Sequence, residues 1–253
     1  MLERIDSPDT DTRTIHLTLT CKCNMKCTYC VSKADLAEDH ELTTREWTDI
    51  IDQLTESYGP VPFIVKGGEP MLRDDFFPLL SHIKSRGHHI TLITNAVLIR
   101  DEKTARELAQ YVDQMEVSLD GISEETTAPI KGEGMFQAIM NGVAQVRKTR
   151  IKLGLSFVIL EQNQSILWSP LEAFLREIGE DTVAVRIDNR LTFPVSLRCR
   201  QGDFFDFLRN TDKLACHGQR GRHPARGELE VDAAGMLHPF CPAASGQREV
   251  RTV

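Results

Sequence analysis

The sequence predicts an α/β fold, a partial (β/α)6 TIM-like barrel with a small C-terminal β-hairpin extension. Short apolar runs alternate with amphipathic segments of helical period from residue 14 to residue 187. Strands that are joined by helices in this way lie parallel and are connected by right-handed crossovers. Glycine and polar motifs directly follow the first four apolar runs, and the active sites of such barrels lie at those ends of the strands.

The apolar runs that we interpret as strands occupy residues 14–20, 62–66, 90–94, 114–119, 152–160 and 182–187. The segments that we expect to form helices occupy residues 43–58, 75–86, 101–110, 135–148 and 169–177. The first helix has a clear start, because Thr43 and Glu46 form a capping box. Its apolar residues fall on one face: Trp47, Ile50, Ile51 and Leu54.

The last quarter of the chain differs in composition from the rest. From Phe193 onward the aliphatic periodicity weakens, and Gly, Arg, His and Pro become more frequent. Residues 228–240 alternate in polarity around Ala234-Gly235, which is typical of a β-hairpin. We therefore place the barrel core in residues 1–192 and a C-terminal extension in residues 193–253.

Composition and charge exclude several classes of function. The 253 residues are 41% hydrophobic and 26% charged, which is ordinary for a soluble globular protein. A net charge of −7 argues against a general polyanion-binding protein, so we expect no nucleic-acid partner. The polar first residues do not read as a signal peptide, and no apolar run is long enough to span a bilayer. We expect a cytoplasmic protein with no membrane partner.

The chain has seven cysteines, and four of them fall close together: Cys21, Cys23, Cys27 and Cys30. In a chain with no sign of secretion, clustered thiols bind metal more often than they form disulfides. Cys23, Cys27 and Cys30 place three thiolates in one loop, whereas a [4Fe–4S] cluster usually takes four. One iron would then lack a protein ligand and be open to a small molecule. The alternative is a zinc site, or disulfides, in a protein without catalytic activity.

Four segments carry a resemblance to a known family. Residues 23–30 (CNMKCTYC), 67–70 (GGEP), 94–96 (TNA) and 117–121 (VSLDG) resemble, in order and spacing, the signature segments of the radical S-adenosylmethionine (SAM) superfamily. Residues 117–136 resemble in particular the branch that contains the molybdenum-cofactor cyclases and the SPASM and Twitch enzymes. The resemblance extends over residues 15–187, and Ala96 stands where the family most often has Gly.

The resemblance implies a [4Fe–4S] cluster on Cys23, Cys27 and Cys30, with SAM as the ligand of the open iron. It also implies an external reductant, flavodoxin or ferredoxin, whose electron passes through the cluster into the SAM sulfonium. The C5′–S bond then breaks, and the 5′-deoxyadenosyl radical abstracts a hydrogen atom from a substrate C–H bond. The protein positions the reactants and excludes water, while the cofactor carries the chemistry.

The resemblance further implies SAM contacts near successive strand ends: Tyr29, Gly67, Gly68, Glu69, Asn95, Ser118, Asp120 and Arg186. Gly67 and Gly68 would let the backbone approach the cofactor, and Glu69 would bind the methionine amine. Ser118 and Asp120 would bind the ribose hydroxyls. Taken alone, residues 67–70 also fit an ordinary turn, and residues 118–120 also fit an ordinary polar strand end.

Three of these residues have two interpretations each. Tyr29 would pack by the adenine or present its backbone to it. Asn95 would line the site or simply make a turn. Arg186 would reach the SAM carboxylate or a substrate anion, or it would form a salt bridge within the barrel.

Cys199, Cys216 and Cys241 follow the predicted barrel, and the last two flank the predicted hairpin. This is similar to the cysteine-flanked hairpin of SPASM and Twitch domains, although the cysteines expected after it are missing, so we do not expect a full SPASM domain. Three interpretations remain open. The thiols ligate an auxiliary Fe–S cluster, one of them is a catalytic hydrogen-atom donor, or they are three free thiols.

These interpretations predict different reactions. An auxiliary cluster would accept the electron of a substrate radical, which favours oxidation or bond formation, whereas a hydrogen-donating thiol favours redox-neutral epimerisation. Because the first strand begins near residue 14, we expect no preceding peptide-recognition domain, which favours a small biosynthetic substrate over a peptide. The sequence therefore predicts a radical SAM enzyme of oxidoreductase type. The alternatives are an epimerase, a peptide-modifying enzyme and a non-catalytic zinc-binding protein.

Overall fold

The computed structural model of the chain describes residues 14–30, 41–166, 169–179, 183–187, 228–231 and 237–239. The strands that it describes are β1 (Thr14–Thr18), β2 (Pro62–Lys66), β3 (His89–Thr94), β4 (Gln114–Ser118), β5 (Lys152–Ile159), β6 (Val183–Ile187), β7 (Glu228–Val231) and β8 (Leu237–Pro239). They form one sheet in the order β6-β5-β4-β3-β2-β1-β7-β8. Strands β1 to β6 pair in parallel, each with its neighbours in the sequence, as in the predicted partial barrel.

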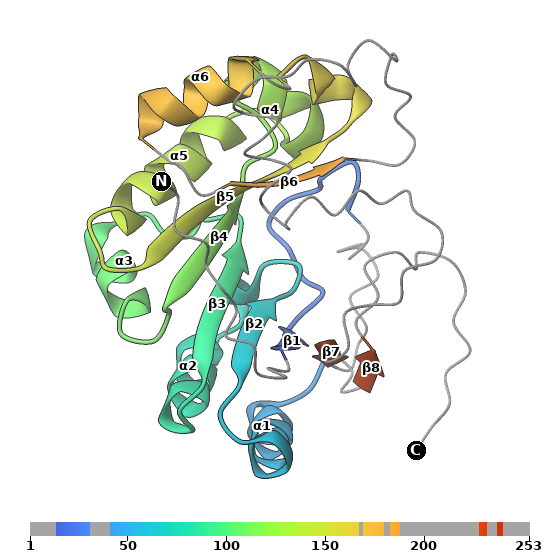
Figure 1. The fold of residues 1–253 in the computed structure, drawn as a ribbon, viewed down its shortest axis with the longest axis vertical. Coiled ribbons are helices and arrows are strands. Elements are labelled where there is room, and N and C mark those ends of the chain that lie inside the picture. Colours follow the sequence, from blue (N-terminus) through green and yellow to red (C-terminus); the bar gives the residue numbers. More distant parts are fainter. Residues whose placement is uncertain are drawn as a thin grey trace, which may run out of the picture.

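The described helices follow the strands. They are α1 (Thr44–Tyr58), η2 (Pro70–Leu72), α2 (Phe76–Ser85), α3 (Glu102–Leu108), α4 (Glu124–Lys131), α5 (Met135–Val146), η3 (Glu161–Ile166) and α6 (Ser169–Ile178), where η marks a 3-10 helix. The α-helices cover the outer face of the curved sheet (Figure 1). Within the part of the chain that the structure describes, none of the helices combines the length and the apolar character that a membrane crossing requires.

The main core lies between the sheet and these helices. In β2, Phe63 and Val65 are fully buried, whereas the alternate residues Pro62, Ile64 and Lys66 are only partly buried. Helix α1 packs its face of Trp47, Ile51 and Leu54 inward, as its periodicity predicts. The predicted capping box is also present at its start. Burial of alternate strand residues against amphipathic helices thus fixes which strand face meets the helices.

Helix α4 is an element that the sequence analysis did not predict. It contains Pro129, and its Thr and Ile residues are poor helix formers, so its propensity is low. A capping box between Ser123 and Thr126 starts it, and Gly132 follows its last residue. The helix ends at Lys131, which makes its position important for the site described below.

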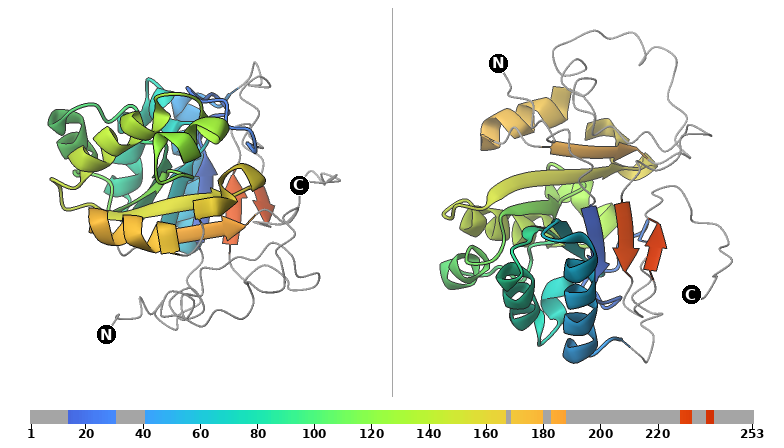
Figure 2. Two further views of the ribbon diagram at one scale, coloured as in Figure 1. Left: turned by 90° about the horizontal axis from the view of Figure 1, so that it is seen from above. Right: turned by 60° about the horizontal axis from the view of Figure 1, so that its bottom comes forward.

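The predicted hairpin is present, because β7 and β8 pair in an antiparallel ladder. Strand β7 also pairs in parallel with β1, with Ile15 opposite Leu229. Figure 2 shows β1, β7 and β8 side by side at one end of the sheet. The hairpin therefore extends the barrel sheet beyond β1, a placement that the sequence analysis did not anticipate. The division at residue 192 stays a prediction.

Candidate functional site

The sequence motifs meet at the carboxyl ends of β1 to β4, around the segment of residues 19–30, which we call the cysteine loop. The amide of Glu69, after β2, donates to the carbonyl of Lys22 over 2.8 Å. The side-chain amide of Asn95, after β3, donates to Asn24 over 2.7 Å. Residues that are dispersed in the sequence are thus joined at the barrel edge where sites of this architecture lie.

The three thiols of the predicted cluster site are unpaired, with Cys30 exposed and Cys23 and Cys27 half-buried. Burial is the main reason why the pKa values of Cys23 and Cys27 are raised. The charges of Glu69, for Cys23, and of Asp120, for Cys27, raise them further, followed by the charges of the neighbouring thiols. The Lys131 ammonium acts in the opposite direction on both. Three unpaired thiols in electrostatic contact, with a cation beside them, fit a three-cysteine cluster. Among the described residues, no three His, Cys, Asp or Glu side chains gather as a single metal ion requires.

The first half of the cysteine loop lies directly against the glycines that follow β2. The amide of Gly68 donates to the carbonyl of Thr20 over 2.8 Å. A Cβ atom at Gly67 would lie 2.5 Å from the carbonyl oxygen of Thr20, and one at Gly68 would lie 2.2 Å from that of Lys22. These glycines are therefore required by the approach of the cysteine loop. The sequence analysis had explained the two glycines by the approach of SAM to the backbone.

Glu41 fixes the entry to the cysteine loop. Its carboxylate accepts hydrogen bonds from the hydroxyl of Thr20, over 2.6 Å, and from the amide of Cys21, over 3.0 Å. The guanidinium of Arg73 lies 3.8 Å from the same carboxylate. Glu41 follows the cysteine loop in the sequence, so it ties the start of the loop to the segment that leads into α1.

Arg73 completes this arrangement, which we call the Glu41–Arg73 clamp. Its guanidinium donates to the carbonyl of Leu19 over 3.0 Å and to that of Leu42 over 2.9 Å. It also forms an ion pair with Asp75, with 2.7 Å between Nε and Oδ1. One side chain thus bonds to the backbone at the start of the cysteine loop and at Leu42, which follows the loop. The sequence analysis missed Arg73 because its partners are distant in the chain.

The Glu69 carboxylate is completely buried and is engaged by the protein itself. It accepts hydrogen bonds from the hydroxyl of Thr94, the amide of Asn95 and the amide of Met71. Burial raises the pKa of Glu69. These hydrogen bonds act in the opposite direction but more weakly, so the pKa lies above its ordinary value. Glu69 therefore joins the ends of β2 and β3, and its predicted contact with the SAM amine stays a prediction.

The second half of the cysteine loop is held by Asp120, which is fully buried at the end of β4. The hydroxyl of Tyr29 donates to its carboxylate over 2.6 Å, and the amide of Val158 donates over 2.7 Å. Burial, followed by the charge of Asp120, raises the pKa of Tyr29 above its ordinary value. In addition, the amide of Thr28 donates to the carbonyl of Ile130 in α4 over 3.0 Å. Asp120 thus anchors the loop, and its predicted contact with ribose stays a prediction.

Lys131 is the most deeply placed cation of the site, with a side chain that is 1% exposed. Its ammonium lies 2.9 Å from the Asp120 carboxylate, 3.1 Å from the Ser118 hydroxyl and 4.0 Å from the Cys27 sulfur. Burial by itself lowers the pKa of Lys131, but Asp120 and then Cys27 outweigh this effect, so the pKa is raised. The lysine is therefore held as a cation between the cysteine loop and β4. Ser118 is partly buried, with its hydroxyl facing this cation.

The remaining predicted site residues are described only in part. Cys199, Cys216 and Cys241 lie outside the described residues, so their predicted roles stay predictions. Arg186 lies in β6, where its backbone pairs in register with Val158 of β5. This places Arg186 near the carboxyl end of a strand next to the one that contacts Asp120.

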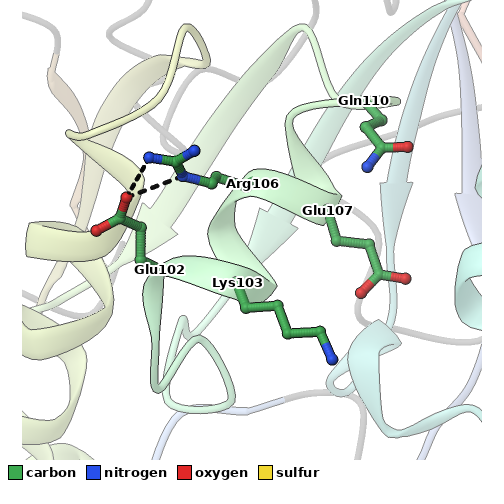
Figure 3. Close-up of a pocket in the computed structure, with 5 residues that line it drawn as sticks. All are labelled: Glu102, Lys103, Arg106, Glu107 and Gln110. Atoms are coloured by element: carbon green, nitrogen blue, oxygen red, sulfur yellow. Dashed lines mark hydrogen bonds and ion pairs between the residues drawn. The ribbon is translucent and has the colours of Figure 1, made fainter.

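A shallow pocket of about 650 Å³ lies on the outer layer of the molecule, along α3 (Figure 3). Its lining residues all belong to α3 or to the turn after it: Glu102, Lys103, Arg106, Glu107 and Gln110. Glu102 and Arg106 bond to one another, so the charges of this surface are partly matched within the helix. The pocket contains none of the cysteines or strand-end residues of the site.

A parallel partial barrel with three unpaired thiols at the carboxyl ends of its strands defines a class of barrel protein that holds a cofactor at that edge. A family model described as "Radical SAM superfamily" matches residues 17–169, so the chain belongs to the radical SAM superfamily. Members of this family use a [4Fe–4S] cluster and SAM. The alternative of a non-catalytic zinc-binding protein is thereby set aside.

Two curated relatives are named as tetrapyrrole synthases. The chain is 36% identical over 148 residues to an Fe-coproporphyrin III synthase of Methanosarcina barkeri, covering 57% of this chain and 36% of the relative. It is 33% identical over 150 residues to a pre-heme d1 synthase of Dinoroseobacter shibae, covering 59% and 37%. A third relative, the mycofactocin maturase MftC of Mycobacterium ulcerans, is 35% identical over 118 residues, covering 47% and 32%. The matched part thus spans only about a third of each relative.

Solved structures show the same fold. SuiB of Streptococcus suis, in a structure bound to S-adenosylmethionine, superposes with a TM-score of 0.73 at 18% identity, covering 95% of this chain and 63% of SuiB. Native anSMEcpe with bound AdoMet superposes with a TM-score of 0.70 at 17% identity, covering 90% and 74%. These likenesses confirm the predicted partial-barrel fold.

Proposed function

We propose that this chain cleaves SAM reductively at a cluster held by Cys23, Cys27 and Cys30, and that a C–H bond of its substrate then loses a hydrogen atom. The observation that carries the proposal is the cysteine loop itself. Its three thiols are unpaired, and both of its halves are bonded to the ends of neighbouring strands. Such fixation holds three ligands in place before a cofactor binds.

The residues of the chain have distinct tasks in this proposal. When bound, the cluster and SAM supply the 5′-deoxyadenosyl radical. Cys23, Cys27 and Cys30 hold the cluster, and Ser118 donates to the ribose. Glu69 and Asp120, both buried and bonded within the protein, fix the strand ends around the cofactor. The electron comes from an external reductant, for which we propose flavodoxin or ferredoxin.

For the substrate, we propose a small biosynthetic molecule that undergoes oxidation or bond formation. This is supported by the two relatives that are named as synthases of tetrapyrroles. The reaction would use an auxiliary cluster on Cys199, Cys216 and Cys241. Redox-neutral epimerisation with one of these thiols as hydrogen donor is the alternative reaction.

A peptide substrate is the second candidate. It is favoured by the relative named as a mycofactocin maturase and by a structure of SuiB bound to the precursor peptide SuiA. Both substrate classes would undergo the same radical step. They differ in size, because the barrel and its extension would have to bind either a small molecule or a peptide.

Anaerobic reconstitution tests the main proposal. Wild-type protein loaded with iron and sulfide, then given SAM and dithionite, is expected to release 5′-deoxyadenosine. The Cys27→Ala variant should lose this activity, whereas Cys21→Ala, which changes a cysteine outside the set, should keep it. Absence of 5′-deoxyadenosine from fully loaded wild-type protein would contradict the proposal.

Iron counting tests the auxiliary cluster separately. A variant with alanine at positions 199, 216 and 241 is expected to bind about half the iron of the wild type, because one of two [4Fe–4S] clusters would be missing. If the variant keeps all its iron, these cysteines hold no cluster.

A further inference from the structure

Lys131 is a buried cation to which the sequence analysis assigned no role. Placing an ammonium out of contact with water is costly, and the cost is reduced only by well-placed partners. Here the partner is Asp120, which is itself fully buried and lies 2.9 Å away. This ion pair also receives the hydroxyl of Tyr29, from the cysteine loop. Because this ammonium is buried, it does not contribute to solubility, and its presence points to another role.

The three donors of the Lys131 ammonium all have partners within the site. One faces Asp120, one faces the hydroxyl of Ser118, and the third faces the sulfur of Cys27 over 4.0 Å. The ammonium thus lies within reach of both the Asp120 carboxylate and the sulfur of a cysteine that we assign to the cluster. At Cys27 the positive charge of Lys131 acts more strongly than the opposing negative charge of Asp120.

The backbone fixes this geometry. Helix α4 is tied to the cysteine loop, because the amide of Thr28 donates to the carbonyl of Ile130. It is packed against the end of β4 at Gly121, where a Cβ atom would lie 2.2 Å from the hydroxyl of Thr127. Lys131 is the last residue of this helix, so its ammonium reaches Cys27 from a rigid element.

We infer that Lys131 is a positioning residue that acts through Cys27 to raise the reduction potential of the bound cluster. The inference rests on the proposed function, since it requires that Cys27 is a cluster ligand. One-electron reduction adds a negative charge to the cluster without a proton. A fixed positive charge and a donor at the Cys27 sulfur stabilise the reduced state more than the oxidised state.

The experiment is a redox titration of the reconstituted protein, followed by electron paramagnetic resonance in the absence of SAM. Lys131→Met removes the charge and the donor and is expected to shift the midpoint potential to more negative values. Lys131→Arg keeps both and should stay close to the wild type. Lys22→Met is the matched control, because it removes an exposed cation of the same loop, whose charge is screened by solvent.

A second variant separates the effect from loss of folding. Lys131→Met alone leaves the Asp120 carboxylate buried without its cation, which destabilises the fold. The double variant Lys131→Met with Asp120→Asn removes both charges and keeps the volume of both side chains. It too should shift the potential to more negative values, because the donor at Cys27 is still missing.

Several results would overturn the inference. Wild-type potentials in both Met variants, at wild-type iron content, would do so. An equal shift in Lys22→Met would also do so, as would an unchanged potential combined with weaker SAM binding, since the ammonium would then serve SAM. Loss of iron from all Lys131 variants, Arg included, would assign the residue to cluster retention instead. A wild-type protein that binds no cluster is a different result, because it would defeat the proposed function itself.

Discussion

The two halves of the cysteine loop are held by different kinds of interaction. The first half lies against Gly67 and Gly68 by backbone hydrogen bonds and is enclosed by the Glu41–Arg73 clamp. The second half is held by side chains, through the buried group of Tyr29, Asp120 and Lys131. The first half should therefore respond to changes of backbone shape, and the second half to changes of charge and of buried hydrogen bonds.

The largest effect is expected at Gly68 in the first half. Gly68→Ala places a methyl group 2.2 Å from the carbonyl oxygen of Lys22, and moving this backbone should cost about 3 kcal/mol of stability. The free energy of unfolding of the apoprotein, measured with urea, and the iron content after reconstitution should both fall. Gly59→Ala is the control, because its Cβ meets nothing within 4 Å and only its φ of +69° is unfavourable. If both variants bind equal iron, backbone shape does not govern the first half.

The next effect is expected at Tyr29 in the second half. Tyr29→Phe leaves the fold of the backbone unchanged and removes a hydrogen bond to a buried carboxylate, which should cost about 2 kcal/mol. Urea unfolding measures the loss, and iron release to a chelator should become faster. Tyr111→Phe is the control, because it keeps the ring that packs near Phe77 and lies outside the cysteine loop, and it should change neither quantity. Equal behaviour of the two variants would show that the buried group does not anchor the loop.

A smaller effect is expected from Arg73→Lys in the clamp. Lysine keeps the charge but cannot bond to the carbonyls of Leu19 and Leu42 together, so the variant should lose about 1 kcal/mol. Iron release to a chelator is expected to be faster than in the wild type. Arg45→Lys, at a residue whose side chain is 91% exposed, is the matched control. An unchanged release rate would remove Arg73 from the description of the first half.

The smallest effect concerns the acid dependence of the clamp. Burial raises the pKa of Asp75, but hydrogen bonds from Arg73 and Thr44 outweigh it, and the pKa lies below its ordinary value of 3.8. Its contribution to stability is therefore complete above that value and is lost as the pH falls through the lowered pKa. The stability difference between the wild type and Asp75→Asn, measured on apoprotein between pH 6 and pH 3, should shrink with acid. A constant difference would show that the ion pair does not contribute.

Local patterns in the sequence predicted the strands and most helices. The capping box of Thr43 and Glu46 and the alternation in β2 are decided by neighbouring residues, and both are present. Helix α4 was missed because Pro129 and β-branched residues lower its propensity, while a cap and contacts with the cysteine loop maintain it. Residues that stabilise an element from elsewhere leave no periodic signal.

The sequence predicted which motifs lie at the carboxyl ends of the strands. The motifs meet there, but Glu69 and Asp120 bond inward to the protein rather than presenting free carboxylates. Their partners are distant in the chain, as are Lys131 and Cys27, which lie 104 residues apart. Such contacts arise from tertiary packing, which the spacing of motifs does not encode. Cys199, Cys216 and Cys241 lie outside the described residues.

The pairing of β7 with β1 bears on the order in which the protein can mature. Strand β1 is synthesised before β7, so Ile15 must wait for Leu229 before its outer edge is paired. An unpaired strand edge is a template for association with other chains, so the nascent protein exposes this hazard next to its cysteine loop while β2 to β6 are being made. Closure of the longest-range pairing of the sheet is also a slow kind of step. The strand that leads into the candidate cluster ligands is thus synthesised before the other described strands of the sheet and is paired on both edges only after β7 has been made.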